Sequence, residues 1–194
     1  MQLKLESTQA TSILLDHHGR VEYLPDIFDE ETSNRLFEAC LNSLNWQHDQ
    51  LWMFGKKITT QRKVAWVGDQ HCSYTYSGVK KDPQPWTDEL LLIKNKMEAL
   101  VQYQLNSCLL NLYHNGSEGM GWHSDDEVEL DRNAPIVSLS LGAVRKFALK
   151  HKLQKTTNSL FLENGSVLVM YPPTQEFWHH SLLKTKQLEI GRAH

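Results

Sequence analysis

The chain has 194 residues, with 20 Lys and Arg against 23 Asp and Glu, ten His and three Cys. This length is typical of one domain, since single cores usually hold about 100–200 residues. The apolar fraction of 40% supports an ordinary core, which excludes a disordered chain, a disulfide scaffold and a coiled coil. No run approaches the roughly 18 apolar residues that a membrane span requires.

The compartment and the overall charge give further bounds. The first residues lack the basic and then apolar order of a signal peptide. The cysteines are scattered without a Cys-x-x-Cys pair, which indicates free thiols in a reducing compartment. The net charge of −3 gives no global signal for a polyanionic partner. Any contact with nucleic acid must therefore come from local clusters of cations.

Two helices are expected in the first half of the chain. Asp29, or Asp26, can cap a helix that begins near Glu30 and continues with apolar residues at helical spacing. Residues 46–82 mix aromatic residues with glycines, which is typical of short strands and loops. A second helix is predicted from about Thr87 to Gln104, where the apolar positions partly follow a 3.6-residue period.

The second half predicts a β core. Its short apolar runs are separated by Gly, Asn and Pro, which favours an antiparallel sandwich or barrel. These runs are residues 108–113, 135–141, 144–150, 159–162, 166–171 and 177–183. We expect a single α+β domain over residues 25–194, preceded by an N-terminal extension, residues 1–24, that is irregular or forms an edge strand.

One triplet, His123-Ser124-Asp125, has the spacing of a metal site. Residues two apart on an extended backbone point to the same side, so both side chains can reach one ion. Alone, such a triplet is expected by chance in a chain this rich in His and acids. Two further candidates, His179 and His180, begin a short strand far downstream. Two His and one carboxylate with open positions are typical of non-haem Fe(II) oxygenases.

Several segments together resemble the AlkB family of Fe(II)/2-oxoglutarate dioxygenases, and within it the branch of DNA-repair demethylases. The matching segments are Phe54-Gly55-Lys56, Tyr74-Thr75-Tyr76-Ser77-Gly78, Pro85-Trp86, Asn111-Leu112-Tyr113, His123-Ser124-Asp125-Asp126-Glu127, Pro135 to Gly142 and Trp178-His179-His180-Ser181-Leu182. Their order and spacing span roughly residues 20–192. The resemblance implies a double-stranded β-helix (jelly roll) core over about 108–192, flanked by N-terminal helices, with lesion-recognition hairpins over about 50–82.

The resemblance also implies the ligands of the Fe(II) ion. His123 and Asp125 match the first two ligands of the family. The family places its third histidine directly before Ser-Leu, which favours His180. Neighbouring strand residues face opposite ways, so His179 and His180 cannot both bind. Spacing alone leaves the choice between them open, and His179 then has a structural or surface role.

The cosubstrate 2-oxoglutarate is expected near the metal, with O2 as the second cosubstrate. Asn111 and Tyr113 match family positions that hydrogen-bond 2-oxoglutarate, although a polar pair on the solvent side of a sheet would look the same. Arg192 matches the first arginine of the Arg-x-Asn-x-Thr-x-Arg strand, but His194 stands where Asn is expected. Either the C-terminal strand is truncated with a foreign end, or the cosubstrate site is incomplete.

The resemblance assigns the substrate to a pocket for a flipped base. By position, Tyr76 and the imidazole of His123 would sandwich the base, Tyr74 would line the pocket and Glu127 would read the lesion. Phe54 resembles the wedge of the hairpin that enters the duplex. A cationic methylated base would be favoured by both an aromatic face and a carboxylate. Strand packing and a solvated acidic loop are the competing explanations.

Contacts with phosphates would need groups of cations. Candidate groups are Lys56/Lys57 with Arg62/Lys63, then Lys80/Lys81, and Arg145/Lys146 with Lys150, His151, Lys152 and Lys155. Each group alone is also explained as a solvated face.

The implied function is oxidative demethylation of 1-methyladenine and 3-methylcytosine in DNA, which releases formaldehyde, succinate and CO2. The expected partner is alkylated DNA, or RNA, and the expected protein is a monomer without membrane contact, cytoplasmic or, in a eukaryote, nuclear. Two alternatives remain: a dioxygenase of the same family acting on RNA or protein, and a catalytically silent nucleic-acid-binding jelly roll. A zinc hydrolase would leave Asn111 and Tyr113 without a role.

Overall fold

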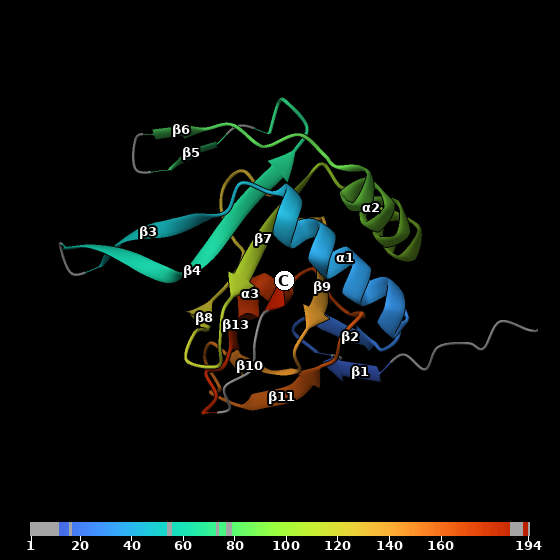
Figure 1. Ribbon diagram of the computed structural model, residues 1–194. Helices are drawn as coiled ribbons and strands as arrows, with labels where there is room; N and C mark the ends of the chain where they lie inside the picture. The colour runs from blue at the N-terminus through green and yellow to red at the C-terminus, as the bar shows by residue number, and fades with distance from the viewer. Residues whose placement is uncertain are drawn as a thin grey trace, which may run out of the picture.

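The computed structural model describes residues 12–15, 17–53, 56–72, 74–76, 79–186 and 192–193. Antiparallel strands form one large and one small sheet, and helices cover one side of the large sheet (Figure 1). The large sheet has the order β1 (Ser12–Leu15), β2 (Arg20–Leu24), β12 (Ser166–Tyr171), β9 (Ile136–Gly142), β14 (Arg192–Ala193), β7 (Ser107–Tyr113), β4 (Lys56–Gly68) and β3 (Gln47–Met53). The small sheet has the order β11 (Thr157–Leu162), β10 (Arg145–His151), β13 (Trp178–Leu182) and β8 (Met120–His123). A separate two-stranded sheet pairs β5 (Tyr74–Tyr76) with β6 (Val79–Lys81).

Both predicted helices are present, and each begins at a side-chain cap. Helix α1 (Glu30–Ser43) begins after Asp29, whose carboxylate accepts a hydrogen bond of 2.7 Å from the N–H of Thr32. Helix α2 (Asp88–Val101) begins after Thr87, whose hydroxyl accepts from the N–H of Leu90. A third, single-turn helix, α3 (Thr174–Phe177), leads directly into β13. The sequence pattern did not predict it.

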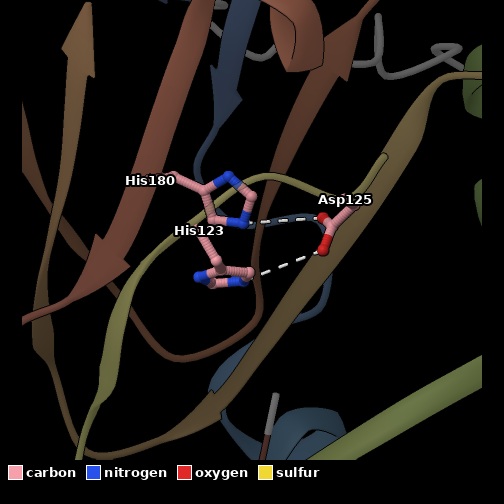
Figure 2. A group of neighbouring side chains, drawn as sticks. All are labelled: His123, Asp125 and His180. Atoms are coloured by element: carbon pink, nitrogen blue, oxygen red, sulfur yellow. Dashed lines mark ion pairs between the residues drawn. The ribbon is translucent and has the colours of Figure 1, made fainter. Parts of the chain in front are cut away.

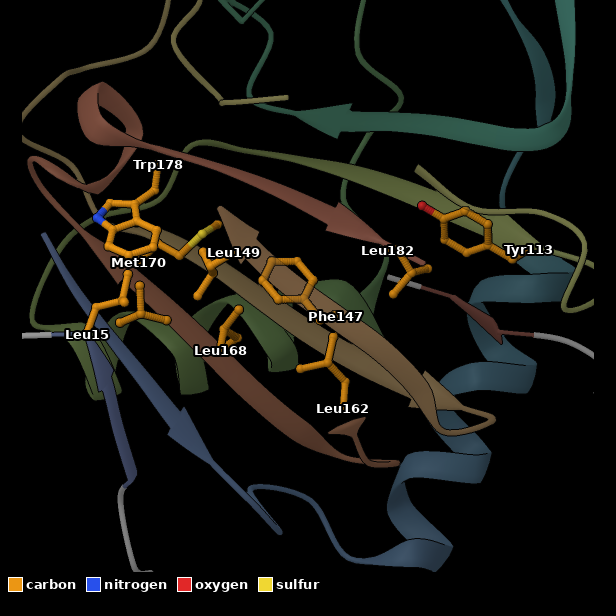
Figure 3. Close-up of a cluster of buried hydrophobic side chains, with 10 residues drawn as sticks. Leu15, Tyr113, Phe147, Leu149, Leu162, Leu168, Met170, Trp178 and Leu182 are labelled. Atoms are coloured by element: carbon orange, nitrogen blue, oxygen red, sulfur yellow. The ribbon is translucent and has the colours of Figure 1, made fainter. Parts of the chain in front are cut away.

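The six predicted strands are all present, and β12 shows how they separate two layers of core. Leu168 and Met170 pack into a cluster that also takes Phe147, Leu149 and other residues of the small sheet (Figure 3). The alternate residues of β12 pack on the other face, in a cluster with residues of both helices. Because β12 is covered on both faces, its sequence is apolar without alternation.

The N-terminal boundary differs from the expected one. Strand β2 pairs with β12 along its full length, and Val21 is completely buried in the cluster between the sheets. Residues 20–24 are therefore part of the core of the domain, although they were expected in an N-terminal extension. The sequence pattern did not predict this inner strand, because Arg-Val-Glu-Tyr-Leu is short and carries two charges. In the structure it lies inside the large sheet, between β1 and β12.

Strand β8 is absent from the strands that the sequence pattern predicts. It is four residues long, and among the described strands its partner is β13. The glycine just before it has a steric reason, because a Cβ at Gly119 would lie 2.5 Å from the carbonyl oxygen of Leu182. A side chain at this position would push β8 away from its partner strand.

Among the described residues, no helix is long and apolar enough to cross a membrane.

Leu168→Ala should lower the free energy of unfolding by about 2–5 kcal/mol, because Leu168 is fully buried between the sheets. Urea denaturation followed by circular dichroism measures this loss. Leu153→Ala is the matched control, since Leu153 is 82% exposed and should change stability by less than about 0.5 kcal/mol. Equal effects of the two substitutions would show that the packing of β12 is described wrongly.

Candidate metal centre

Two histidines meet because β13 and β8 are neighbours in the small sheet. His180 lies directly opposite His123 in the antiparallel register, and their ring centroids are 4.1 Å apart. Residues directly opposite each other in a β ladder share a face of the sheet. His180 is buried, and its ring stacks on Phe147 at a centroid distance of 5.6 Å. The inner face of the small sheet therefore presents two imidazoles side by side.

The carboxylate of Asp125 completes the group (Figure 2). Its Oδ1 lies 3.7 Å from Nε2 of His123, and its Oδ2 lies 3.5 Å from Nε2 of His180. The three possible ligand atoms all lie within 4.8 Å of one another. Asp125 follows the last residue of β8 by two positions and lies outside the strand. The structure thus brings together the three residues that the sequence analysis selected.

The tautomer of His123 suits a metal ion. Its Nδ1 lies 2.8 Å from the carbonyl oxygen of Gly121, and since a carbonyl only accepts, Nδ1 carries the proton. The lone pair of Nε2 then faces Asp125 and His180. Bonds of about 2.0–2.1 Å to a first-row ion place neighbouring ligands about 3 Å apart, so a shift of under about 1 Å would close the site. This geometry fits two His and one carboxylate on one face of an ion.

The pKa shifts within this group also favour the binding of a metal ion. Burial lowers the pKa of His180 to about 3, with further contributions from His123 and His179, so its imidazole is neutral and can act as a ligand. Burial also raises the pKa of Asp125; the imidazole of His123 opposes this, and the carboxylates of Glu127 and Asp126 add to it. A divalent cation would favour the charged carboxylate and the neutral imidazole at once.

His179 is turned away from this group. Its Nδ1 lies 3.1 Å from the hydroxyl oxygen of Ser124, and the same hydroxyl donates a hydrogen bond of 2.9 Å to the carbonyl of Trp178. Because that proton is used, Nδ1 of His179 is the donor to Ser124. His179 therefore contacts the backbone loop that carries Asp125.

Two of the predicted cosubstrate residues, Asn111 and Tyr113, lie on β7, which is in the large sheet. Asn111 accepts a hydrogen bond from the guanidinium of Arg62, which also forms a 2.8 Å ion pair with Asp49. Arg62 is only 6% exposed, so its assignment to a surface group of phosphate contacts with Lys63 was wrong. Sequence reasoning missed Arg62 and Asp49 here, since nothing in their spacing shows that a cation of β4 is buried.

Tyr113 is also buried and lies beneath a second arginine. The guanidinium of Arg145 is 5.7 Å from the ring centroid of Tyr113 and donates to the carbonyls of Glu118 and Leu183. Arg145 is 3% exposed, which excludes it from the expected surface cluster of cations. Arg192 lies on β14 in register with Tyr113, so the backbone of the last strand runs beside the predicted cosubstrate residues.

The structure describes three of the four predicted substrate residues, namely Tyr74, Tyr76 and Glu127. Glu127 is exposed and lines a cavity of about 220 Å³ that Asp125 also lines. Tyr74 and Tyr76 occupy alternate positions of β5 in the two-stranded sheet. Phe54 lies outside the described residues. The β3–β4 hairpin that leads to it pairs as far as Met53 and Lys56.

Comparison with known proteins places this geometry in a family. A family model described as the 2OG-Fe(II) oxygenase superfamily matches residues 20–192. The chain belongs to this family. It therefore takes Fe(II), 2-oxoglutarate and O2. The group of His123, Asp125 and His180 that the fold brings together is the candidate iron site.

Within this superfamily, relatives place the chain in the AlkB family. DNA oxidative demethylase ALKBH2 of Mus musculus is 37% identical over 149 residues, which cover 73% of this chain and 62% of that protein. Alpha-ketoglutarate-dependent dioxygenase alkB homolog 3 of Bos taurus is 34% identical over 178 residues, covering 86% of this chain and 61% of that protein. The chain thus spans about three fifths of the length of these relatives.

A solved structure confirms the fold class. The structure of OsALKBH1 superposes with a TM-score of 0.61 at 14% identity and covers 89% of this chain and 96% of that one. At this identity the likeness shows the fold alone. The expected α+β fold with a jelly-roll core and flanking helices is confirmed.

The two adjacent histidines give a matched test of the metal centre. His180→Ala should weaken Mn(II) binding, measured by calorimetry on the metal-free protein, by more than about 100-fold, because the loss of a ligand exceeds the 10–100-fold typical of residues around ligands. His179→Ala should weaken binding by less than about tenfold, since His179 contacts Ser124 instead. The reverse ranking would exchange the two residues in the ligand set.

Proposed function

We propose that this protein removes N-methyl groups from alkylated bases of DNA, such as 1-methyladenine and 3-methylcytosine, with release of formaldehyde, succinate and CO2. The observation that carries the proposal is the convergence of His123, Asp125 and His180 from two strands and a loop onto one point. The names of the ALKBH2 relatives, DNA oxidative demethylases, support the choice of DNA.

The three ligands would hold Fe(II) and leave its remaining positions for 2-oxoglutarate and O2. When bound, the iron supplies the oxidation of the methyl carbon. Asn111, Tyr113 and Arg192 are proposed to bind 2-oxoglutarate. Asn111 has the better-defined surroundings, because its carbonyl oxygen is occupied by Arg62 and its amide group is left to donate. The ion pair with Asp49 holds Arg62 in place and so fixes the orientation of the Asn111 side-chain amide.

The substrate base would leave its stack to reach the metal, because a methyl group on the pairing edge is inaccessible inside a duplex. Tyr74 and Tyr76 are proposed to stack on the extruded base, together with the imidazole of His123, and Phe54 to fill its place. Glu127 is proposed to favour cationic bases, and its position on the cavity beside Asp125 supports this role. The protein would act as a monomer, in the cytoplasm or in the nucleus of a eukaryote.

Asp125→Ala should reduce succinate release from 2-oxoglutarate, in the presence of Fe(II) and a methylated oligonucleotide, to the level without enzyme. The reason is that a group of two imidazoles alone provides neither the third ligand nor its charge. Circular dichroism should show an unchanged fold, since Asp125 lies beyond the end of β8. Retained turnover would remove Asp125 from the ligands, and turnover on methylated RNA alone would make RNA the substrate.

Glu127→Gln should slow the repair of cationic 1-methyladenine more than that of a neutral methylated base. The substitution removes a negative charge beside the base and keeps its size, so the loss should amount to about 1 kcal/mol or more of Coulomb attraction at the cationic lesion. Glu129→Gln is the control, because Glu129 is an exposed acid of the same loop that does not line the cavity. Equal losses on both lesions would refute the role.

A further inference from the structure

The loop that carries Asp125 lacks a strand partner. Strand β8 ends at His123, which is opposite His180, and residues 124–127 follow outside regular secondary structure. Ladder hydrogen bonds therefore fix the two imidazoles but do not fix the carboxylate. Other groups must hold the backbone of Asp125, since a partly buried N–H needs an acceptor.

The acceptor comes from α3. The side-chain Oε1 of Gln175 accepts a hydrogen bond of 2.9 Å from the backbone N–H of Asp125. The Nε2 of the same amide points at the sulfur of Met170, 3.4 Å away. The backbone carbonyl of Gln175 accepts from Nζ of Lys152 at 2.8 Å. Gln175 is thus held at its backbone and at both ends of its amide.

The position of α3 is itself fixed by the core. Thr174, which precedes Gln175, is 1% exposed, and its hydroxyl donates a hydrogen bond of 2.6 Å to the carbonyl of Tyr171 at the end of β12. Lys152, which holds the carbonyl of Gln175, also lies 3.7 Å from the carboxylate of Asp126. Buried β12 and the loop of Asp125 are therefore connected through a single turn of helix.

A second contact holds the preceding residue of the loop. The hydroxyl of Ser124 donates to the carbonyl of Trp178 and accepts from Nδ1 of His179. The peptide group between Ser124 and Asp125 is therefore attached on one side by Ser124 and at its own N–H by Gln175. These contacts set the direction in which the Cα–Cβ bond of Asp125 leaves the backbone.

We propose that Gln175 is a positioning residue of the metal centre: its amide oxygen holds the backbone of Asp125 so that the carboxylate stays opposite His123 and His180. This proposal rests on the proposed function of these three residues as metal ligands. Partners that orient ligands contribute about 10–100-fold to metal affinity. Gln175 acts on the backbone of the ligand, where a β strand would otherwise supply the partner.

The surroundings of Gln175 separate positioning from simple packing. Gln175 is half-buried and lines the cavity of about 220 Å³ beside Asp125. A shorter or apolar side chain would leave the N–H of Asp125 facing this space, with room for the loop to turn. Because few apolar contacts are lost, the fold itself should tolerate the change.

The test measures Mn(II) binding to the metal-free full chain by calorimetry, without substrate. Gln175→Leu, which has no acceptor, should weaken Mn(II) binding by about 10–100-fold. Gln175→Glu keeps an acceptor oxygen at the same reach and should restore most of the affinity. Glu176→Gln is the matched control. Glu176 lines the same cavity, and its described hydrogen bond goes to Pro173 and not to the loop of Asp125. This variant should bind Mn(II) as tightly as the unsubstituted chain does.

Two results would overturn the proposal. One is an unchanged Mn(II) affinity in Gln175→Leu, and the other is an equal loss in Gln175→Leu and Gln175→Glu. Urea unfolding of the metal-free variants checks that the fold is kept. Should Gln175→Leu not fold, Gln175→Ser provides the same comparison, because serine is polar and too short to reach the N–H.

The proposed function fails in a different way. If Asp125→Ala and His180→Ala bind Mn(II) as tightly as the unsubstituted chain, the metal centre lies elsewhere and the proposed function is wrong. If these two variants lose binding and Gln175→Leu does not, the metal centre stands and only the role of Gln175 is refuted.

Discussion

The pairing of β8 with β13 is the contact on which the metal centre depends. Strand β8 is short and lies at the edge of its sheet in the part of the chain that the structure describes, so the ladder with β13 sets where His123 points. A slip of one residue would turn His123 to the outer face and bring the exposed Trp122 inward. Strand β13, in contrast, is held by Trp178 and Leu182 in the core between the sheets. The core therefore fixes the metal geometry through β13, and β8 follows it.

This dependence explains how much of the fold the sequence could predict. Asp29 and Thr87 begin helices because their side chains accept from backbone N–H groups nearby in the sequence, which is a local signal. The core strands are marked by apolar runs between turn residues. Strand β8 has neither property, because its four residues include a glycine and an exposed tryptophan, and it is recognised as a strand through its pairing with β13. The triplet at its end was noticed for its spacing, and the family resemblance then gave it the role of metal ligand.

Buried charge is the second feature that sequence reasoning could not locate. Arg62 and Arg145 both stand next to a lysine, which makes each pair look like a solvated cluster of cations. In the structure each arginine binds groups from distant segments: Arg62 binds Asp49 and Asn111, and Arg145 donates to two backbone carbonyls. Burial of a guanidinium requires such partners. Only tertiary packing brings an arginine and these partners together, so a count of formal charges in the sequence does not show which arginines are buried.

The three proposed metal ligands differ in how firmly the fold holds them. The His180 side chain is 7% exposed and packed on Phe147, whereas His123 and Asp125 are 35% and 28% exposed on an edge strand and a loop. The site as described is slightly wider than a coordinated ion allows, so ligands must move inward when a metal binds. His180 cannot move without disturbing the core. The inward movement on metal binding must therefore be made by His123 and Asp125. For this reason, the hydrogen bonds to the loop after β8 matter more to the metal centre than additional packing against that loop would.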